Sequence, residues 1–315
     1  MAGVAKIQAE LLRGAGHQVD QIELPMFGAA WPWPVKAVAL PVRLAAYLPA
    51  VLRLRGGRYD VIHIHWLTQG VAGVLSGRRF FVQAHGSDLH LNLSNPIYRW
   101  FTRLVLNRAT AIFYVTPNLK DYLRDYEGKI VYLPNPVDVQ AIAPDPKPPT
   151  RVAKALIFTR LDPVKGVDRI FPAAEALSKL AEVTALAWGP LAASYAERYG
   201  PFVKFVPIVP HEKVGVFLQE FDLVIGQMQQ GILSLMEIEA LAAGRPLITG
   251  INRELYPDDS PPVRRATYPD EIVRAVADLK RDPSKLASEG REWVARNHGY
   301  EHHLDILEAT YFKQA

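Results

Sequence analysis

Two cations five positions apart, Arg160 and Lys165, follow the apolar run 154–159 and stand beside Gly166. A guanidinium makes forked hydrogen bonds to phosphate oxygens, whereas an ammonium acts as a compact point charge. Glycine lets the backbone approach a ligand closely, and a helix that begins here adds the positive end of its dipole. The pattern predicts a diphosphate site where a strand ends. Two solvated cations in a surface loop are the alternative.

The segment 231–246 combines a Gly-Ile-Leu-Ser loop with a helical pattern that carries Glu239. Backbone N–H groups at the start of a helix suit anionic or hydroxyl-rich ligands. Glu239 lies among apolar neighbours and needs a partner, which ribose hydroxyls or Arg245 would supply. Glu237 points to another side of the helix, and we interpret it as structural. The binding residues predicted in this segment are Gly231, Ile232, Leu233, Ser234, Leu235 and Glu239.

Polar side chains follow the apolar run 79–84, where His85 and Asp88 belong to the sequence His-Gly-Ser-Asp. Doubly wound folds bind ligands beyond the carboxyl ends of their parallel strands, so we expect both residues to line a cleft. His65 ends another apolar run and is expected to line the same cleft, whereas His63 is expected to be buried and satisfied. No spacing of His, Asp and Glu predicts a metal site.

Short apolar runs alternate with helical patterns along the chain, which predicts an α/β protein with parallel sheets covered by helices. After about residue 267 the pattern is helical to the end, with a last helix over about 300–313. The predicted strands are 17–24, 60–65, 79–84, 110–115, 129–133, 154–159, 182–188, 202–206, 221–226 and 246–249.

Prolines mark the junction between two predicted domains. The Pro-Asn-Pro sequence around Asn135 predicts a rigid turn with a structural role and a second role in shaping the cleft. Four prolines within 143–150 exclude a helix or a central strand and predict a semi-rigid linker. The predicted domains are therefore 1–145 and 146–298, followed by a C-terminal helix, 299–315, that crosses back to the first domain.

The positive charge is concentrated in the first half of the chain. Residues 1–145 contain 15 Lys and Arg against 10 Asp and Glu, whereas 146–315 contain 21 against 22. The run 31–58 contains no acid, and its cations are Lys36, Arg43, Arg53, Arg55 and Arg58. Such a segment either contacts an anionic membrane surface or forms a helix packed on the sheet with solvated arginines. It contains no motif that reads nucleic acid.

Composition excludes several classes of protein. Cys is absent from the 315 residues, so the chain has no disulfide framework and no cysteine nucleophile. The sequence contains no stretch of eighteen consecutive apolar residues, so it predicts no membrane-spanning helix. The first residues do not have the pattern of a secretory signal. We expect a cytoplasmic protein, peripheral at the inner face of a membrane if the basic run binds lipid.

Taken in order, these groups resemble the retaining family 4 glycosyltransferases, which have the GT-B fold of two Rossmann-like domains facing a cleft. The motifs that carry the resemblance are Leu11–Val19, His85–Asp88, Pro134–Asp138, Arg160–Asp168 and Glu239–Pro246. The resemblance implies that the first domain binds the acceptor and the second binds a nucleotide diphosphate-sugar. It implies that Arg160 and Lys165 bind the diphosphate, that Glu239 binds the ribose and that His85 binds the donor sugar. It implies no cofactor and no metal.

The chain departs from the family pattern at two places. Gly231 stands where the family usually has a second glutamate that contacts the donor sugar, so Gln227, Gln230 or a backbone amide is expected to replace it. The chain also begins inside the family's first glycine-rich loop. We therefore expect either that the natural chain starts upstream, with the first strand of the N-terminal domain, or that the edges of this sheet close differently. We expect that an added upstream strand would raise stability and activity.

The sequence thus predicts a metal-independent hexosyltransferase that moves a sugar to a hydroxyl of a glycan or lipid-linked acceptor. A nucleotide-sugar epimerase is one alternative, although it would need acids in the cleft. A non-catalytic GT-B protein that binds a nucleotide or glycan as a partner subunit is the other.

Overall fold

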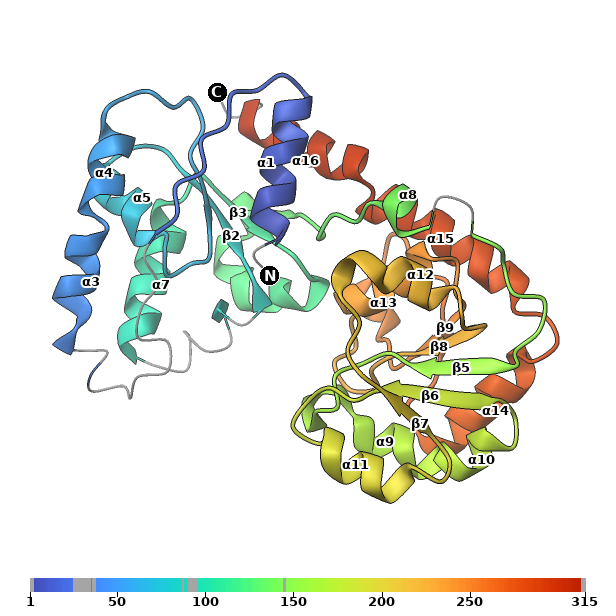
Figure 1. Ribbon diagram of the computed structural model, residues 1–315. Coiled ribbons are helices and arrows are strands. Elements are labelled where there is room, and N and C mark those ends of the chain that lie inside the picture. The colour runs from blue at the N-terminus through green and yellow to red at the C-terminus, as the bar shows by residue number, and fades with distance from the viewer. Residues whose placement is uncertain are drawn as a thin grey trace. The chain divides into compact units, whose positions relative to one another are not determined.

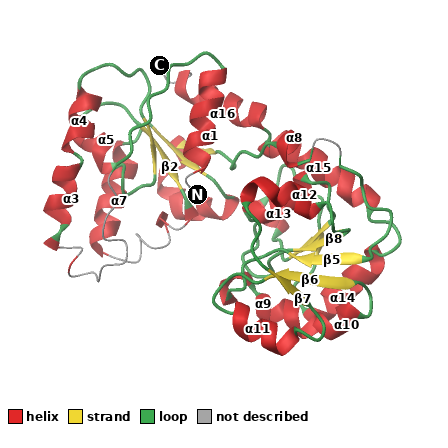
Figure 2. Cartoon of the chain, viewed as in Figure 1, coloured by secondary structure: helices red, strands yellow, loops and turns green. Residues whose placement is uncertain are grey.

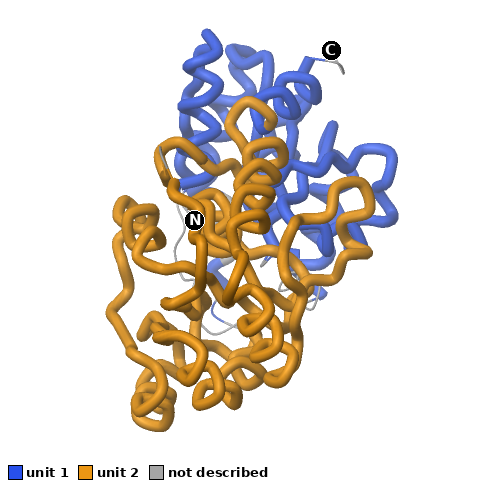
Figure 3. The backbone as a smooth tube through the Cα atoms, turned by 90° about the vertical axis from the view of Figure 1, so that its right-hand side faces the viewer, with its two compact units in different colours: residues 1–134, 303–315 blue, residues 135–302 orange. Residues whose placement is uncertain are grey.

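The computed structural model describes residues 3–24, 35, 38–86, 88–89, 96–143 and 146–312. The chain divides into two compact units (Figure 1). Unit 1 is Met1–Pro134 with His303–Ala315, and unit 2 is Asn135–His302 (Figure 3). The proline-rich stretch 143–150 therefore lies within the range of unit 2.

Unit 1 is built on a four-stranded parallel sheet in the order β1-β2-β3-β4. Its strands are β1 (His63–His65), β2 (Phe81–Ala84), β3 (Ala111–Tyr114) and β4 (Ile130–Tyr132). Its helices are α1 (Gly3–Gly14), α3 (Leu40–Ala46), α4 (Leu48–Arg55), α5 (Val71–Ser76), α7 (Pro96–Arg108) and the 3-10 helix η1 (Pro117–Lys129). All four strands lie within predicted apolar runs.

The two faces of the unit 1 sheet are covered by different helices because side chains of a strand alternate between faces. Val82 and Ile112 pack in a cluster with α5, α7 and η1. Phe81 and Phe113 pack on the other side with Leu307 and Tyr311 of α16 (Tyr300–Phe312). Burial of each such side chain stabilises the fold by about 1.5–3 kcal/mol.

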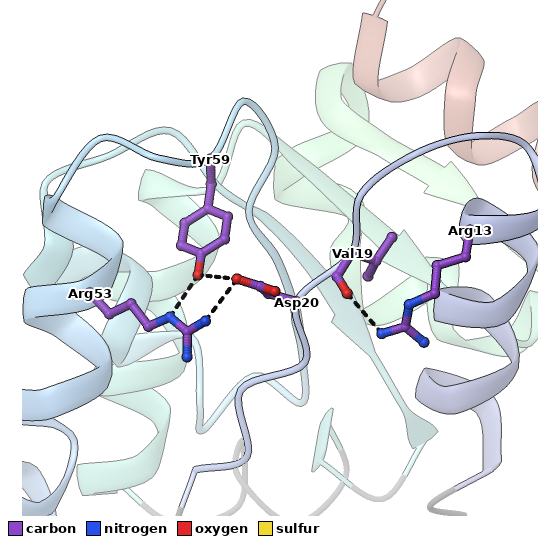
Figure 4. Close-up of polar contacts among 5 residues, drawn as sticks. All are labelled: Arg13, Val19, Asp20, Arg53 and Tyr59. Carbon is purple, nitrogen blue, oxygen red and sulfur yellow. Dashed lines mark hydrogen bonds and ion pairs between the residues drawn. The ribbon is translucent and has the colours of Figure 1, made fainter.

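The predicted strand 17–24 is wrong, because these residues are extended but belong to no strand in the described parts of the chain. Side chains hold the segment instead (Figure 4). Arg13 donates to the Val19 carbonyl over 2.7 Å, and Asp20 accepts from Arg53 over 2.7 Å and from Tyr59 over 2.8 Å. Apolar residues alone do not make a strand, which also requires a neighbouring backbone for its N–H and C=O groups.

A pocket of about 530 Å³ is lined by this segment, by α1 and by β1, which is an edge strand of the sheet. Its walls are largely apolar and include Ala9, Leu12, Ile22, Leu54 and Ile64. Tyr311 and the two imidazoles of β1 also line it. Both extended segments that border the pocket thus lack a strand partner on that side among the described residues.

Unit 2 has a six-stranded parallel sheet in the order β10-β9-β8-β5-β6-β7, with helices around it (Figure 2). Its strands are β5 (Lys154–Ile157), β6 (Glu182–Leu186), β7 (Lys204–Val206), β8 (Leu223–Ile225), β9 (Leu247–Thr249) and β10 (Arg264–Arg265). The last of these was not predicted, since Arg264–Arg265 is short, exposed and basic. The other five lie within predicted runs.

The unit 2 sheet is covered on both faces. Leu156 and Val224 pack with α12, α13 and α15, whereas Ile157 and Ile225 pack with α9, α10 and α14. The α-helices are α8 (Val139–Ile142), α9 (Val167–Ile170), α10 (Ala174–Ser178), α11 (Ala192–Tyr199), α12 (Val214–Leu218), α13 (Leu235–Ala242), α14 (Pro269–Leu279) and α15 (Ser284–His298). The 3-10 helices are η2 (Pro163–Lys165), η3 (Phe171–Ala173), η4 (His211–Lys213) and η5 (Arg253–Leu255).

The predicted helical end of the chain is confirmed by α14, α15 and α16. From His303 onward, α16 belongs to unit 1, where His303 bonds the Pro134 carbonyl over 2.8 Å and Glu308 bonds His17 over 2.8 Å. Across the described residues, no helix is both long and apolar enough to span a bilayer.

Candidate functional site

Arg160 and Lys165 lie in one tight loop of unit 2 that follows the central strand β5. Asp162 organises this loop, because its carboxylate accepts from Val164 N over 3.1 Å and pairs with the Arg160 guanidinium at 2.8 Å. Gly166 ends η2 with φ 69°, and a Cβ there would approach the backbone of Met228 and Gln229 at 3.1 Å. The glycine therefore permits a close approach of two loops.

The loop that contains Met228, Gln229 and Gln230 makes two hydrogen bonds to Lys165. The Lys165 carbonyl accepts from Met228 N over 2.8 Å, and Lys165 Nζ donates to Gln230 Oε1 over 2.5 Å. Burial lowers the pKa of Lys165, a shift opposed by the Glu237 carboxylate and reinforced by the neighbouring Arg160. The two predicted phosphate cations are therefore close enough to sense each other's charge, and neither is bound to a buried carboxylate.

Gln227 shapes the loop that carries Gly231. Its side chain is fully buried, and its Oε1 accepts from Gln229 N over 2.9 Å and from Gln230 N over 2.6 Å. Its Nε2 donates to the Ile232 carbonyl over 2.7 Å. Gly231 has φ 71°, a conformation that favours glycine. Gln227 is thus occupied by the loop itself, and Gln230 is the carboxamide that reaches a predicted site residue.

Two backbone amides of the predicted binding loop are also occupied. Leu233 N donates to the Tyr256 hydroxyl over 3.0 Å, and Ser234 N donates to Glu237 Oε2 over 2.7 Å. These amides serve the loop and the start of α13. Leu235, the first residue of α13, is 40% exposed.

Glu237 is a fully buried carboxylate with four donors around it. Oε2 accepts from Ser234 N and from Ser234 Oγ over 2.6 Å, and Oε1 accepts from Gln227 N over 3.1 Å and from Thr249 Oγ1. Burial raises the pKa of Glu237, and these hydrogen bonds oppose the shift. The bonds join β8, α13 and β9, in agreement with a structural role.

Glu239 has a different partner from the one considered in the sequence. Arg245 is engaged by carbonyls, including that of Phe221 over 2.9 Å, so the Glu239–Arg245 alternative is wrong. Glu239 Oε1 instead lies 3.0 Å from Nε2 of His211, whose side chain is 78% exposed. Burial raises the pKa of Glu239, and His211 opposes this. A buried carboxylate is thus covered by one exposed ring.

In unit 1, His85 and Asp88 follow β2 and are both buried. Asp88 Oδ2 accepts from Leu67 N over 3.0 Å, whereas Asp88 Oδ1 and His85 Nε2 have no hydrogen-bond partner among the described residues. Burial lowers the pKa of His85 to about 4 and raises the pKa of Asp88 to about 7. Ser87, which lies between them, is outside the described residues.

A column of five rings crosses the ends of β1, β2 and β3. The ring centroids of Phe113 and His63 are 5.1 Å apart, those of His63 and His65 are 4.8 Å apart, and those of His65 and His85 are 5.8 Å apart. Trp66 closes the column at 4.5 Å from His85. Burial lowers the pKa of His65 to about 3 and that of His63 well below its usual value, so the imidazoles are neutral at pH 7.

The expectation that His63 is buried and satisfied is only half correct. His63 Nδ1 lies 2.5 Å from the Tyr311 hydroxyl, but His63 Nε2 has no partner among the described residues.

Asn135, in unit 2, makes a backbone contact: its carbonyl oxygen lies 3.0 Å from His298 Nδ1. Its side-chain Oδ1 is buried and has no hydrogen-bond partner among the described residues. No group of His, Asp and Glu in the described parts of the chain could hold a metal ion.

Sequence reasoning missed several residues that organise these sites. Asp162 carried a signal, because Asp before Pro at the start of a helix is a common capping pattern. His211 carried none, because it is 28 positions from Glu239 in the sequence. Trp66 follows His65 at the carboxyl end of a predicted strand, but nothing in the sequence indicates its φ of 71°, which its residue type does not favour.

The chain has two α/β units, each built on a parallel sheet with polar loops at its strand ends. This architecture is that of the GT-B fold class. Residues 8–141, in unit 1 and the first residues of unit 2, match the family model described as Glycosyltransferase Family 4. No curated protein sequence matches the chain significantly.

Solved structures share the fold at low sequence identity. Sucrose-phosphate synthase from Thermosynechococcus elongatus is 17% identical, with a TM-score of 0.69 over 98% of this chain and 92% of that one. A glycosyltransferase from Rickettsia africae is 15% identical, with a TM-score of 0.69 over 99% and 94%. Anabaena HepE, solved with UDP and glucose, is 14% identical, with a TM-score of 0.64 over 96% and 88%. The GT-B expectation for the fold is therefore confirmed.

Proposed function

We propose that this protein transfers a hexose from a nucleotide diphosphate-sugar to a hydroxyl of a glycan or lipid-linked acceptor, with retention of configuration. Unit 2 binds the donor, and unit 1 binds the acceptor. The observation that carries the proposal is the pair of cations in one loop of unit 2, Arg160 and Lys165, next to Gln230. The structures of HepE with UDP-glucose and of Staphylococcus aureus TarM with UDP support a nucleotide donor.

The proposed chemistry is electrostatic. The bond between the anomeric carbon and the diphosphate oxygen breaks while the acceptor oxygen bonds to the same face of that carbon. The acceptor proton passes to the leaving phosphate. Negative charge develops on the diphosphate, and Arg160 and Lys165 are placed to stabilise it without a metal. Ribose hydroxyls take the place of His211 on Glu239, and His85 hydrogen-bonds the donor sugar.

Gln230 takes the position of the family's missing acid in this proposal. Its carboxamide already accepts from Lys165 over 2.5 Å, so it keeps the ammonium in place without neutralising it. Gln230 Nε2 would donate to a hydroxyl of the sugar.

Calorimetry with UDP and GDP tests donor binding. We expect one of the two to bind, and Arg160→Ala to weaken that binding about tenfold to a hundredfold, because a charge-assisted bond contributes about 1.5–3 kcal/mol. Arg198→Ala, on the exposed helix α11, is the matched control and should leave the affinity unchanged. If neither nucleotide binds, the donor role of unit 2 is wrong; if one binds but no acceptor is glycosylated, the partner-subunit alternative is favoured.

Contact with an anionic membrane is part of the proposal. Helices α3 and α4 expose apolar side chains, with Val42 65%, Leu48 54% and Leu52 57% exposed. Apolar side chains and cations on the same helices suit an interfacial helix. Against this, Arg53 and Arg55 donate to groups of unit 1, so these two cations are used internally.

Sedimentation with lipid vesicles tests this contact. We expect binding to vesicles that contain phosphatidylglycerol and not to phosphatidylcholine alone, and we expect Val42→Asp to weaken it severalfold. Val216→Asp, in the 73% exposed position of α12, is the control. Equal binding of both variants would refute a role for α3 and α4.

A further inference from the structure

The strand β1 ends in an unusual backbone conformation. Trp66 N continues the ladder by donating to the Gln83 carbonyl over 3.1 Å, and the chain then turns with Trp66 at φ 71°. Trp66 is the one non-glycine residue with positive φ in the described parts of the chain. A bulky residue in this region costs of the order of 1–3 kcal/mol, so other contacts must hold it there.

Asp88 supplies one such contact. Its carboxylate is 6% exposed and accepts from the N–H of Leu67, the residue that follows Trp66, over 3.0 Å. The turn is closed by Gln69 N, which donates to the Trp66 carbonyl over 3.0 Å. Asp88 therefore ties the segment after β2 to the turn after β1.

This turn places the indole on the face of His85. The centroids of the Trp66 and His85 rings are 4.5 Å apart and the ring planes differ by 30°. His65 lies on the imidazole at 5.8 Å with an angle of 24°. His85 is 9% exposed, and its Nε2 has no partner among the described residues. The imidazole is thus fixed between two rings while one nitrogen is available for hydrogen bonding.

We propose that Trp66 and Asp88 are positioning residues for His85: Asp88 holds the Trp66 turn, and the indole holds the imidazole. Asp88 acts through the turn and does not touch the acceptor. The inference rests on the proposed function only in the statement that His85 contacts the donor sugar. The ring geometry and the Asp88–Leu67 bond stand without it.

The pKa of His85, measured by NMR titration of its ring, tests the geometry without any substrate. Trp66→Asn removes the indole but keeps a residue that tolerates positive φ, so the turn should survive. Burial is the main cause that lowers this pKa to about 4, so its loss should move the pKa by about two units toward 6.5. Trp66→Phe should give a smaller shift, and Trp100→Ala, at a 61% exposed position, none.

Two variants of Asp88 separate positioning from chemistry. Asp88→Asn keeps an oxygen that accepts from Leu67 N, so the pKa of His85 should stay within about half a unit of the wild type. Asp88→Ala removes the acceptor and should shift this pKa as Trp66→Asn does. If Asp88→Asn is as defective as Asp88→Ala, the carboxylate itself acts and the proposal is wrong. It is equally wrong if Trp66→Asn leaves the pKa of His85 unchanged.

Kinetics with UDP-glucose as the probe, scored by release of UDP, link the geometry to the reaction. Trp66→Asn should lower kcat about tenfold to a hundredfold, because a small displacement of a contact residue is enough for such a loss. KM should change less than about threefold, since Trp66 and Asp88 are not placed on the donor. Asp88→Asn should lower kcat less than Asp88→Ala does, because the amide oxygen still accepts from Leu67 N. If the pKa of His85 responds as expected but the wild-type protein releases no UDP, the positioning role stands and this donor assignment fails.

Discussion

The buried polar groups of the two units are satisfied to different degrees. In unit 2, both oxygens of Glu237 and both polar atoms of Gln227 have partners within the loop cluster. In unit 1, buried side-chain atoms at the ends of β1 and β2 have none among the described residues: His63 Nε2, Gln83 Nε2, His85 Nε2 and Asp88 Oδ1. The loop cluster of unit 2 thus satisfies its own buried groups, and Asn135 Oδ1 is the buried side-chain atom without a partner among the described residues of that unit, whereas the strand ends of unit 1 hold four such atoms.

The same contrast extends to the titratable groups. Unit 1 buries His63, His65 and His85 with pKa values lowered by burial, whereas in unit 2 burial lowers the pKa of His298, to about 4. Burial also raises the pKa of one acid in unit 1, Asp88, and of two in unit 2, Glu237 and Glu239. Acid should therefore destabilise unit 1 more than unit 2.

An expected effect of pH follows from this difference. A histidine whose pKa is lowered on folding contributes stability above pH 6.5 that is lost as the pH falls, because the unfolded chain binds the proton first. An acid whose pKa is raised does the reverse and gains stability as the pH falls. Between pH 6 and 5, unit 1 should lose about 2 kcal/mol, because three histidines outweigh Asp88 by a net two protons, while unit 2 should lose little.

Hydrogen exchange measured by mass spectrometry at pH 7, 6 and 5 checks this, with peptides from β2 and β3 compared with peptides from β5 and β8. His65→Phe should reduce by about one the number of protons that unit 1 takes up on unfolding, and so should make its stability depend less steeply on pH. His302→Phe, at an exposed position, should not. Equal loss of protection in both units would contradict the comparison.

A second effect tests the satisfied network of unit 2. Glu237→Ala should lower the free energy of unfolding by about 3 kcal/mol, because four donors lose their buried acceptor. Urea denaturation measures it. Glu239→Ala is the control on the same helix: it loses one bond, to an exposed imidazole, and should cost about 1 kcal/mol. A larger loss for Glu239→Ala would mean that the roles of the two acids are reversed.

The parallel sheets could be predicted because apolar runs and their spacing are local properties. Nine of the ten predicted runs contain a strand, and the tenth, 17–24, has no strand partner among the described residues. The pattern of apolar residues along one segment indicates which face of a strand is buried, but it does not indicate which other segment pairs with that strand. For the same reason β10, with only Arg264 and Arg265, could not be found from its own residues.

For the candidate site, the sequence predicted which residues lie together in one loop, but not the partners of residues in separate segments. The clustering of Arg160, Lys165 and Gly166 follows from short spacing in a single loop, which the sequence displays directly. The bond of Glu239 to His211, and the position of Trp66 on His85, depend on tertiary contacts between segments far apart in the chain. Their residue types are compatible with many other contacts, so the sequence favoured none of them.

The pocket beside β1 gives unit 1 a thermal property that its composition does not suggest. This space of about 530 Å³ is open to solvent, and it leaves apolar side chains in its lining, including Leu12, Ile22 and Val61, only partly buried. The heat capacity change of unfolding grows with the apolar surface that unfolding newly exposes to water. Because the folded unit 1 already exposes part of this surface, its stability should depend less steeply on temperature than that of a unit without such a pocket.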